Sequence, residues 1–289
     1  MKIRTYILVL WLCSAIAVSL QAHAQEAVIH ENAPASYGHE HTNVLKLRAG
    51  YSRQLDTYLS PLAFHGWQVG LGNEWWQSFR SKTGLSGAGR PAGWGHVGRV
   101  DIAAATYTNT ARSNSFYGLQ IAAGWGAFYC WQWLDNRLKL HLGPYLEAGF
   151  AARDLNGNVN KPLSFDIAVD LMAMSGISWS FYGNKTSYRL NYLVRTNLLG
   201  FDYLPHYWQS YYEITEGVPG MARCSGHWNH HSLKHELTLD MQFSHSTWRI
   251  GATHLLNDYG TADLHFSQNT VGLVIACIWK YRLYPNARL

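Results

Sequence analysis

The chain is poor in charge and has no long apolar run beyond its first residues. Charged residues make up 14% of the sequence, compared with about 25% in soluble domains. The formal net charge is only +5 and no basic run accompanies it, which argues against a nucleic-acid partner. No segment after the N-terminus reaches the ~18 apolar residues of a membrane-spanning helix. The sequence therefore favours neither a nucleic-acid-binding protein nor a helical membrane protein.

Cysteines and phosphate-binding motifs are also scarce. The sequence has four cysteines, and Cys13 lies in the N-terminal signal described next. The other three, Cys130, Cys224 and Cys277, are an odd number, so at least one thiol has no partner within the chain. The 26 glycines form no phosphate-binding loop motif. Neither a disulfide-rich scaffold nor a nucleotide-binding enzyme is indicated.

The first 24 residues have the layout of a cleaved secretory signal. Lys2 and Arg4 precede an apolar stretch from Tyr6 to Leu20, and small residues in Ala22-His23-Ala24 follow it. This order is typical of a signal peptide. The sequence predicts that the mature chain begins at Gln25.

The mature sequence is rich in aromatic residues and alternates with a period of two. Between residues 117 and 133 the odd positions are apolar or aromatic, including Leu119, Ile121 and Trp125, whereas the even positions are mostly small or polar. Residues 163–181 alternate in the same way. Shorter alternating stretches lie at 45–52, 67–72, 99–104, 138–143, 188–195, 236–241, 248–253 and 271–280. Such alternation predicts strands with one face suited to lipid.

These ten stretches predict an all-β fold, a single antiparallel transmembrane β-barrel. Soluble strands average ~5–6 residues, so the two longest stretches disfavour a soluble β-sandwich. The barrel is predicted at 43–284, after a periplasmic N-terminal segment at 25–42 and before a C-terminal tail at 285–289. Tight periplasmic turns are expected at 135–136, 183–184 and 244–245, and outer loops at 152–162, 199–230 and 257–268. The long Gly-rich segment 81–94 falls on the periplasmic side, which leaves twelve strands as an alternative.

Several local strings resemble a family of uncharacterised outer-membrane proteins of Bacteroidota, the domain-of-unknown-function family numbered 3316. The strings are Leu55-Asp56-Thr57-Tyr58-Leu59-Ser60-Pro61, Gly143-Pro144 with Asn156-Gly157-Asn158, Gln209-Ser210-Tyr211-Tyr212-Glu213-Ile214, Ser232-Leu233-Lys234-His235, Leu237-Thr238-Leu239-Asp240 and Trp248-Arg249-Ile250-Gly251. They occur in order over most of the mature chain. The resemblance implies a Gram-negative outer-membrane protein with no established activity, and it supplies no catalytic residues.

Charged residues of both signs are predicted to point into the barrel. The interior residues singled out are Arg48, Arg99, Asp101, Asp166, Asp170, Arg189, Arg195, Glu236, Asp240 and Arg249. A barrel of about ten strands is only slightly wider than the eight-stranded barrels that side chains fill. We expect these groups to neutralise one another and fill the lumen; the alternative is a narrow channel for small solutes.

The segment 199–231 is the longest predicted loop and is rich in aromatic side chains. Its aromatic binding candidates are Tyr207, Trp208, Tyr211, Tyr212 and Trp228. Exposed aromatic rings can grip sugars or peptides. The other interpretation is a lid over the barrel mouth or part of the interfacial aromatic girdle. The ligand or protein partner is not indicated by the sequence.

A metal site and a hydrolase site are the chemical alternatives. Cys224, His227, His230 and His231 lie within eight positions, and their side chains suit zinc or copper. However, the chain has 15 histidines, which raises the chance of such a cluster, so we predict no cofactor. His265 and Ser267 are predicted to share the outward face, where a His–Ser pair could attack a lipid ester, but no acidic partner is apparent from the sequence.

Taken together, these features predict a monomeric, non-enzymatic protein of the outer membrane of a Gram-negative bacterium. Its partner is the lipid bilayer of that membrane.

Overall fold

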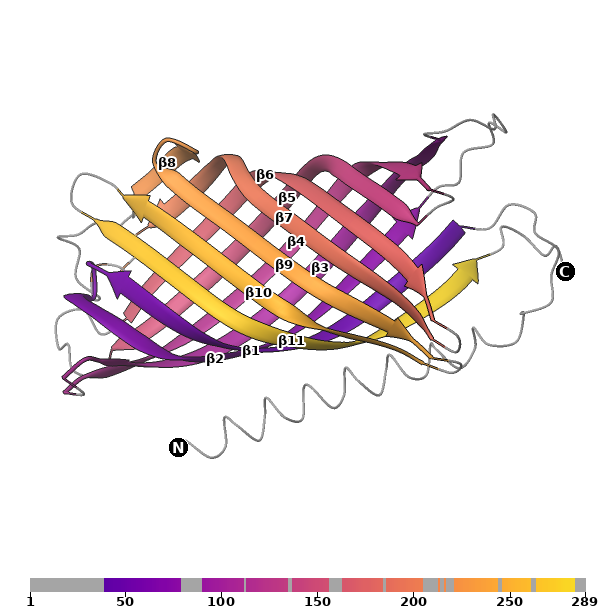
Figure 1. The fold of residues 1–289 in the computed structure, drawn as a ribbon. Coiled ribbons are helices and arrows are strands. Elements are labelled where there is room, and N and C mark those ends of the chain that lie inside the picture. Colours follow the sequence, from indigo (N-terminus) through magenta and orange to yellow (C-terminus); the bar gives the residue numbers. More distant parts are fainter. Residues whose placement is uncertain are drawn as a thin grey trace, which may run out of the picture.

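Ten long β-strands form one closed barrel in the computed structural model (Figure 1). The structure describes residues 39–283 apart from gaps at 79–89, 112, 135–136, 156–162, 184–185, 205–212, 214–215, 217–220, 244–245 and 261–263. The ten ring strands are β1 (His39–Asp56), β2 (Ser60–Ser78), β3 (Arg90–Asn109), β4 (Ser115–Trp133), β5 (Leu138–Leu155), β6 (Leu163–Tyr182), β7 (Ser187–Leu204), β9 (His230–Gln242), β10 (Thr247–Gly260) and β11 (His265–Leu283). A short strand, β8 (Met221–Gly226), pairs with β7 and lies outside the ring.

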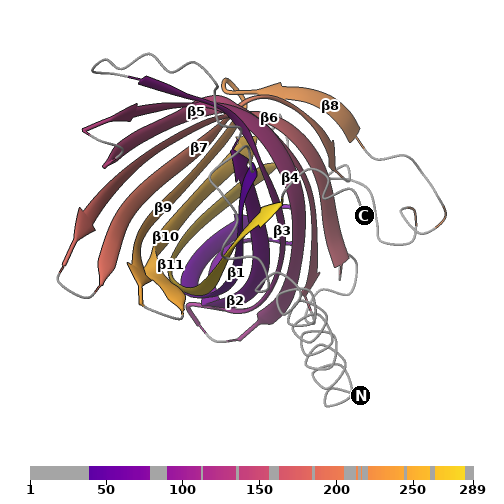
Figure 2. The same cartoon turned by 90° about the vertical axis from the view of Figure 1, so that its right-hand side faces the viewer.

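Every pairing in the barrel is antiparallel. Around the ring the order is β1, β2, β3, β4, β5, β6, β7, β9, β10 and β11, and β11 pairs with β1 to close it. Figure 2 shows the strands wrapping around one axis. The prediction of an all-β antiparallel barrel with ten strands is confirmed, and the twelve-strand alternative is wrong. Among the described residues no helix is long and apolar enough to cross a membrane.

The two ends of the barrel differ in their connections. At the turn end, short turns join β4 to β5, β6 to β7 and β9 to β10; in two of them Gly183 N donates to Thr186 O and Phe243 N to Ser246 O. The start of β1 and the end of β11 also lie at this end. The opposite end, called the loop end here, carries β8 and the turn 57–59 between β1 and β2, and β3, β5, β7 and β10 end there.

Side chains alternate between the interior and the outer surface, as the period-two pattern requires. On β1, Val44 and Lys46 are buried while Leu47 is 54% exposed. Exposed apolar residues form a belt on the outside that includes Val69, Ile102, Ile121, Leu146, Val169, Ile177, Leu237, Ile250 and Leu273. The ring strands have 13 to 20 residues. A strand needs ~9–11 residues to cross a bilayer, so the longer ones would extend past it.

Some predicted boundaries differ from the structure. β1 begins at His39, inside the predicted N-terminal segment 25–42. The prediction of one continuous loop over 199–231 is wrong, because β7 extends to Leu204 and both β8 and the start of β9 lie within this range. Strands likewise extend into the predicted loops 152–162 and 257–268. The signal peptide predicted at 1–24 and the tail predicted at 285–289 lie outside the described residues.

Candidate functional site

Charged side chains fill the middle of the barrel interior. Lys46 Nζ lies 2.9 Å from Glu74 Oε2 and 2.5 Å from Glu236 Oε1. Arg195 Nη2 lies 3.4 Å from Glu74 Oε2. We call this group of interior residues the central cluster: Lys46, Arg48, Glu74, Arg99, Asp101, Arg195, Glu236, Asp240 and Arg249. Burying these ions is tolerable because each is paired with an opposite charge.

One ion pair of the central cluster reaches across the full width of the barrel. Arg195 is on β7 and Glu74 on β2, and these strands are five positions apart around the ring in either direction. Arg195 is 2% exposed, and its guanidinium also lies 4.7 Å from the centre of the Tyr145 ring on β5. Side chains from opposite walls therefore meet in the bore.

A second group of charges lies nearer the loop end. Arg153 on β5 pairs with Asp56 on β1 at 3.0 Å and with Asp166 on β6 at 2.5 Å. The Tyr259 hydroxyl donates to Asp166 at 2.7 Å. We call this the loop-side cluster; its members are Asp56, Glu147, Arg153, Asp166, Asp170, Asp202, Arg223, His230 and Lys234. It links strands that are distant in sequence, as the central cluster does.

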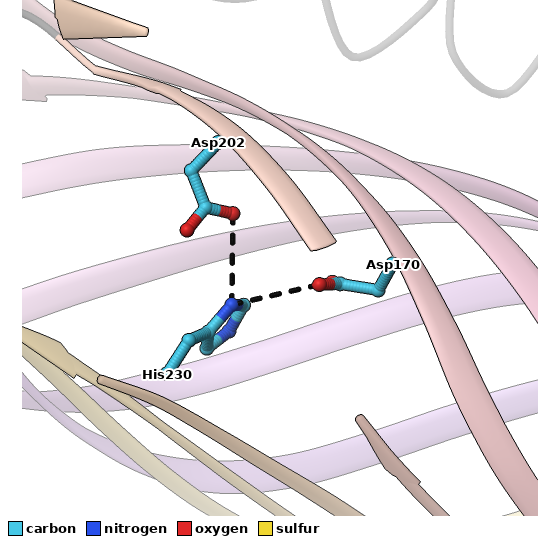
Figure 3. Close-up of side chains that lie close together, drawn as sticks. All are labelled: Asp170, Asp202 and His230. Carbon is cyan, nitrogen blue, oxygen red and sulfur yellow. Dashed lines mark ion pairs between the residues drawn. The ribbon is translucent and has the colours of Figure 1, made fainter. Parts of the chain in front are cut away.

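Three residues of the loop-side cluster converge on one point (Figure 3). His230 Nδ1 lies 3.6 Å from Asp170 Oδ1 and 3.5 Å from Asp202 Oδ1. All three side chains are buried, and the three atoms lie within 4.8 Å of one another. None of these atoms has a hydrogen-bond partner. Two carboxylates and an imidazole at this spacing are a donor set that suits a metal ion.

A bulge in β7 brings Asp202 into the interior. In β7, Met172 pairs with Asn197 and Leu171 with Leu199, so Leu198 is an extra residue that shifts the alternation. Asn197 faces inward before this bulge, and Asp202 faces inward after it. A bulge of this kind re-aims the side chains that follow it.

The second irregularity separates β8 from β9. Between the pairs Leu199–Gly226 and Thr196–Leu233, β7 contributes two residues, whereas the opposite segment contributes the six residues 227–232. Asn197 holds this insertion in place, because its Nδ2 donates to His230 O at 2.5 Å and its Oδ1 accepts from Ser232 N at 2.8 Å. His230 lies in this insertion and continues the regular alternation of β9, in which Ser232, Glu236 and Asp240 also face inward.

Two adjoining cavities lie in the interior. One, of about 140 Å³, is lined by central-cluster residues such as Arg48 and Glu236. The other, of about 130 Å³, is lined by Asp170, Asp202 and His230 among others. Glu147 and Lys234, which form an ion pair, border both. Charged side chains thus lie between these two cavities.

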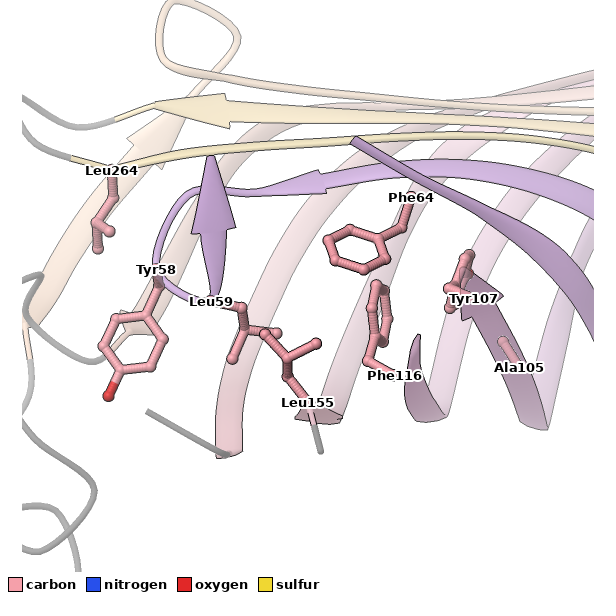
Figure 4. Close-up of a cluster of buried hydrophobic side chains, with 8 residues drawn as sticks. All are labelled: Tyr58, Leu59, Phe64, Ala105, Tyr107, Phe116, Leu155 and Leu264. Carbon is pink, nitrogen blue, oxygen red and sulfur yellow. The ribbon is translucent and has the colours of Figure 1, made fainter. Parts of the chain in front are cut away.

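An apolar cluster covers part of the loop end (Figure 4). Tyr58 and Leu59, in the β1–β2 turn, fold over the bore and are each 4% exposed. They lie in one cluster with Phe64, Ala105, Tyr107, Phe116, Leu155 and Leu264. Burial, with the nearby carboxylates of Asp56 and Glu213, raises the pKa of Tyr58 to about 12. The phenol therefore stays neutral, and this turn adds no charge to the mouth.

Comparison with known proteins identifies the family. The family described as "Protein of unknown function (DUF3316)" matches residues 6–265. The chain belongs to the DUF3316 family. No curated protein matches this chain.

Solved structures similar to this DUF3316 protein are barrels with little sequence identity to it. The transport unit of the autotransporter AIDA-I from Escherichia coli is 11% identical over 94% of this chain and 98% of that chain, with a TM-score of 0.46. The outer membrane protease OmpT from Escherichia coli is 7% identical over 88% and 99%, with a TM-score of 0.41. The translocator domain of the autotransporter NalP from Neisseria meningitidis is 11% identical over 94% and 97%, with a TM-score of 0.33. The likeness is one of fold.

The structure places nine of the ten predicted interior residues of this DUF3316 barrel in two groups. Arg48, Arg99, Asp101, Arg195, Glu236, Asp240 and Arg249 lie in the central cluster, and Asp166 and Asp170 lie in the loop-side cluster. Arg189 donates to the Ser180 hydroxyl at 3.2 Å, away from both groups. Apolar side chains also fill the interior, including Val97, Phe128, Cys130, Tyr145, Met172 and Met174.

The four predicted metal ligands are not brought together. His230 is 3% exposed and faces inward, whereas Cys224, His227 and His231 are exposed. The rings of His227 and His231 do contact each other, with centroids 4.8 Å apart. His230 instead joins Asp170 and Asp202, which the sequence analysis did not connect with it.

The remaining candidates lie on the outer surface or outside the described residues. His265 Nε2 lies 3.4 Å from Asp258 Oδ1, an acidic neighbour that the sequence did not reveal. In the described part of the chain, however, Ser267 and His265 share no hydrogen bond, so no nucleophile–base pair is formed. Trp228 is 72% exposed beside β8. Tyr207, Trp208, Tyr211 and Tyr212 lie outside the described residues.

Sequence reasoning missed several interior charges for two different reasons. Glu74, Glu147 and Arg153 continue the alternation of stretches that were recognised, so longer predicted strands would have included them. His230 likewise continues the inward positions of β9 that include Glu236 and Asp240. Asp202 instead lies beyond the bulge that shifts the alternation of β7, and no local sequence signal marks this bulge.

Proposed function

We propose that this protein is a closed outer-membrane barrel of a Gram-negative bacterium that conducts no solutes and acts by binding at its loop end. The apolar belt on the outer surface supports insertion in a bilayer. Among the described residues, the loop end carries both the exposed Trp228 and the cavity beside Asp170, Asp202 and His230. The role is non-enzymatic, and the protein acts as a monomer.

The pair between Arg195 and Glu74 carries the proposal of a closed bore. Their charged groups come within 3.4 Å from opposite walls, and Lys46 occupies the space beside them. Solutes could pass only if these buried groups separated. Removing one partner from a buried pair costs about 3–5 kcal/mol, so spontaneous opening is rare.

Planar-bilayer recordings test this proposal. Purified wild-type protein should give no steady conductance. A variant that shortens three side chains of the central cluster, Lys46→Ser with Glu74→Ser and Arg195→Ser, should conduct small ions. Arg53→Ser, which changes an exposed residue on the outer face of β1, is the matched control and should stay closed. Large steady conductance from the wild-type protein would contradict the proposal.

A narrow channel is the second candidate, and the two adjoining cavities favour it. If small solutes pass between them, the path runs beside Arg195, which lines the first cavity. Replacement of Arg189 and Arg195 by Ala should then change the ion selectivity of a small wild-type conductance. A wild-type conductance whose selectivity is unchanged in this variant would remove the channel from consideration.

A further inference from the structure

We propose that Asp170, Asp202 and His230 form a binding site for one divalent transition metal ion of the Zn²⁺ type. The site is at the loop end of the interior, built from β6, β7 and the first residue of β9 (Figure 3). It does not depend on whether the barrel conducts. Five observations support it: ligand spacing, unsatisfied polar atoms, the orientation of the three side chains, local charge and space for water.

The spacing of the donor atoms fits a small metal ion. Zinc binds His nitrogen and carboxylate oxygen at about 2.0–2.2 Å in a tetrahedral arrangement. Two ligands of a tetrahedron with such bonds are then about 3.4 Å apart. The distances from His230 Nδ1 to Asp170 Oδ1 and Asp202 Oδ1 are 3.6 and 3.5 Å. The two carboxylate oxygens lie within 4.8 Å of each other, so binding would bring them closer by at most about 1.4 Å to complete the set.

The three donor atoms are buried, and a neutral His230 ring with its proton on Nε2 leaves them without a hydrogen-bond partner. His230 and Asp202 are each 3% exposed and Asp170 is 8% exposed. Buried polar atoms in native proteins almost always have a partner, and unsatisfied ones need an explanation. Here one oxygen of each carboxylate and the Nδ1 atom of the imidazole face the same point. A single cation at that point would satisfy all three.

Neighbouring groups hold the three side chains in this orientation. Asn257 Oδ1 lies 2.8 Å from His230 Nε2, so the proton of a neutral ring belongs on Nε2 and the lone pair of Nδ1 faces the carboxylates. Metal-binding histidines are usually fixed in this way through their second nitrogen. Arg223 Nη2 holds the other oxygen of Asp202 at 3.3 Å.

Gly200 gives the Asp170 carboxylate its place. A Cβ atom at position 200 would overlap Asp170 Oδ1 and would lie 2.8 Å from Ser225 Oγ. The carboxylate therefore packs against bare backbone of β7. Any larger residue at this position would push the oxygen away from His230.

The local charge also favours a cation. In the loop-side cluster five carboxylates, Asp56, Glu147, Asp166, Asp170 and Asp202, face three permanent cations, Arg153, Arg223 and Lys234. With a neutral His230, two negative charges are uncompensated. Unpaired charges in a buried position are costly, and one divalent ion balances them.

The cavity beside the site can supply the remaining ligand. All three residues line the cavity of about 130 Å³, and a water molecule occupies about 30 Å³ in the liquid. A metal with three protein ligands and one water is a common zinc arrangement. The imidazole ligand argues against Ca²⁺ and Mg²⁺, which prefer oxygen ligands only.

Metal titration of the full-length protein in detergent micelles tests the proposal. After treatment with a chelator, the wild-type protein should bind one Zn²⁺ per chain, measured by competition with a chromogenic indicator and by elemental analysis. His230→Gln and Asp202→Asn should each weaken binding by roughly 100-fold or more, since even the outer partners of a metal site contribute 10–100-fold. His231→Ala, which removes the exposed neighbouring imidazole, is the matched control and should bind as the wild type does.

Two controls keep the result interpretable. Circular dichroism and heat-dependent gel migration show whether each variant forms the barrel. If His230→Gln fails to fold, Asp170→Asn and the wild-type stoichiometry decide. The proposal is overturned if folded wild-type protein binds no Zn²⁺ at one per chain. It is also overturned if the substitutions Cys224→Ser and His227→Ala abolish binding while the Asp170, Asp202 and His230 variants retain it.

Discussion

The central cluster and the loop-side cluster use the same residue types to different effect. In the central cluster five cations, Lys46, Arg48, Arg99, Arg195 and Arg249, face four carboxylates, Glu74, Asp101, Glu236 and Asp240. The loop-side cluster has more carboxylates than cations, and Asp170 Oδ1, Asp202 Oδ1 and His230 Nδ1 lie close together in it. The comparison teaches that burying many charges does not itself define a role. In our proposals the central cluster, with one more cation than carboxylates, closes the bore, whereas the loop-side cluster, with surplus negative charge, binds a cation.

The largest expected effect on stability comes from removing one cation from each of the two clusters. Arg153→Met should destabilise the barrel by about 3–5 kcal/mol, because Asp56 and Asp166 lose their shared partner in a region that is already negative. Lys46→Met should cost less, because Arg195 and Arg249 still face Glu74 and Glu236. Guanidinium unfolding in micelles, followed by tryptophan fluorescence, measures both. Equal losses would show that the charge imbalance has no energetic consequence.

The apolar cluster at the loop end should come next. Phe116→Ala should cost about 3 kcal/mol, because Phe116 is 2% exposed and its ring contacts Tyr107 and Phe64 at centroid distances of 4.5 and 4.9 Å. Phe150→Ala removes a ring on the outer surface and is the control. The same unfolding experiment should show a smaller loss for it. A larger loss for Phe150 would mean that the cluster contributes little to closing the mouth.

Zn²⁺ should stabilise the protein only through the proposed site in the loop-side cluster. At a free Zn²⁺ concentration about 100 times the dissociation constant, the free energy of unfolding should rise by about 2.7 kcal/mol. The wild type and Lys46→Met should both respond, since the central cluster takes no part in binding. His230→Gln should show no rise. A similar rise in His230→Gln would place the bound ion elsewhere.

Two glycine substitutions test the position of the Asp170 carboxylate and should destabilise the barrel less than the preceding changes. Gly200→Ala should weaken Zn²⁺ binding by roughly tenfold or more and destabilise the barrel by about 1–3 kcal/mol, because the new methyl group overlaps the Asp170 carboxylate. Gly149→Ala is the control, since its added Cβ would meet no atom within 4 Å although Gly149 lines the same cavity. Indicator titration compares the two. Unchanged affinity in Gly200→Ala would mean that Asp170 is not a ligand.

The smallest effect on stability is expected at the surface. Trp228→Ala should change the free energy of unfolding by less than about 0.5 kcal/mol, because the ring is 72% exposed. The proposed role in binding predicts that this variant loses retention on glycan or peptide arrays that capture the wild type. Tyr182→Ala, a similarly exposed aromatic at the turn end, should retain it. Equal retention by both variants would exclude Trp228 from the binding surface.

The sequence predicts the barrel well because residues that face the membrane recur at every second position along each strand. Leu119, Ile121 and Trp125 alternate with small residues over a length that soluble strands rarely reach, and the structure has β4 there. The same alternation assigns Arg48 and Asp101 to the interior. Local composition suffices for such residues because face and register follow from position along a regular strand.

The convergence of Asp170, Asp202 and His230 could not be predicted in this way. Asp202 is separated from the regular part of β7 by the bulge at Leu198, which changes the face that the following residues occupy. His230 lies on the regular inward side of β9, but the six-residue insertion around it, held by the hydrogen bonds of Asn197, sets where β9 begins beside β7. The sequence also placed His230 near Cys224 and His231, because it shows proximity along the chain and not across the barrel.

The seam between β1 and β11 joins the first and last strands of the ring over its whole height, from His39 opposite Leu283 to Asp56 opposite Phe266. Until the final strand is in place, β1 keeps an open edge, and the pair of Lys46 on β1 with Glu236 on β9 is not held together by a closed ring. A polypeptide that ends before β11 would therefore expose an unpaired strand edge to lipid. We expect β11 to be required for stable insertion of the barrel.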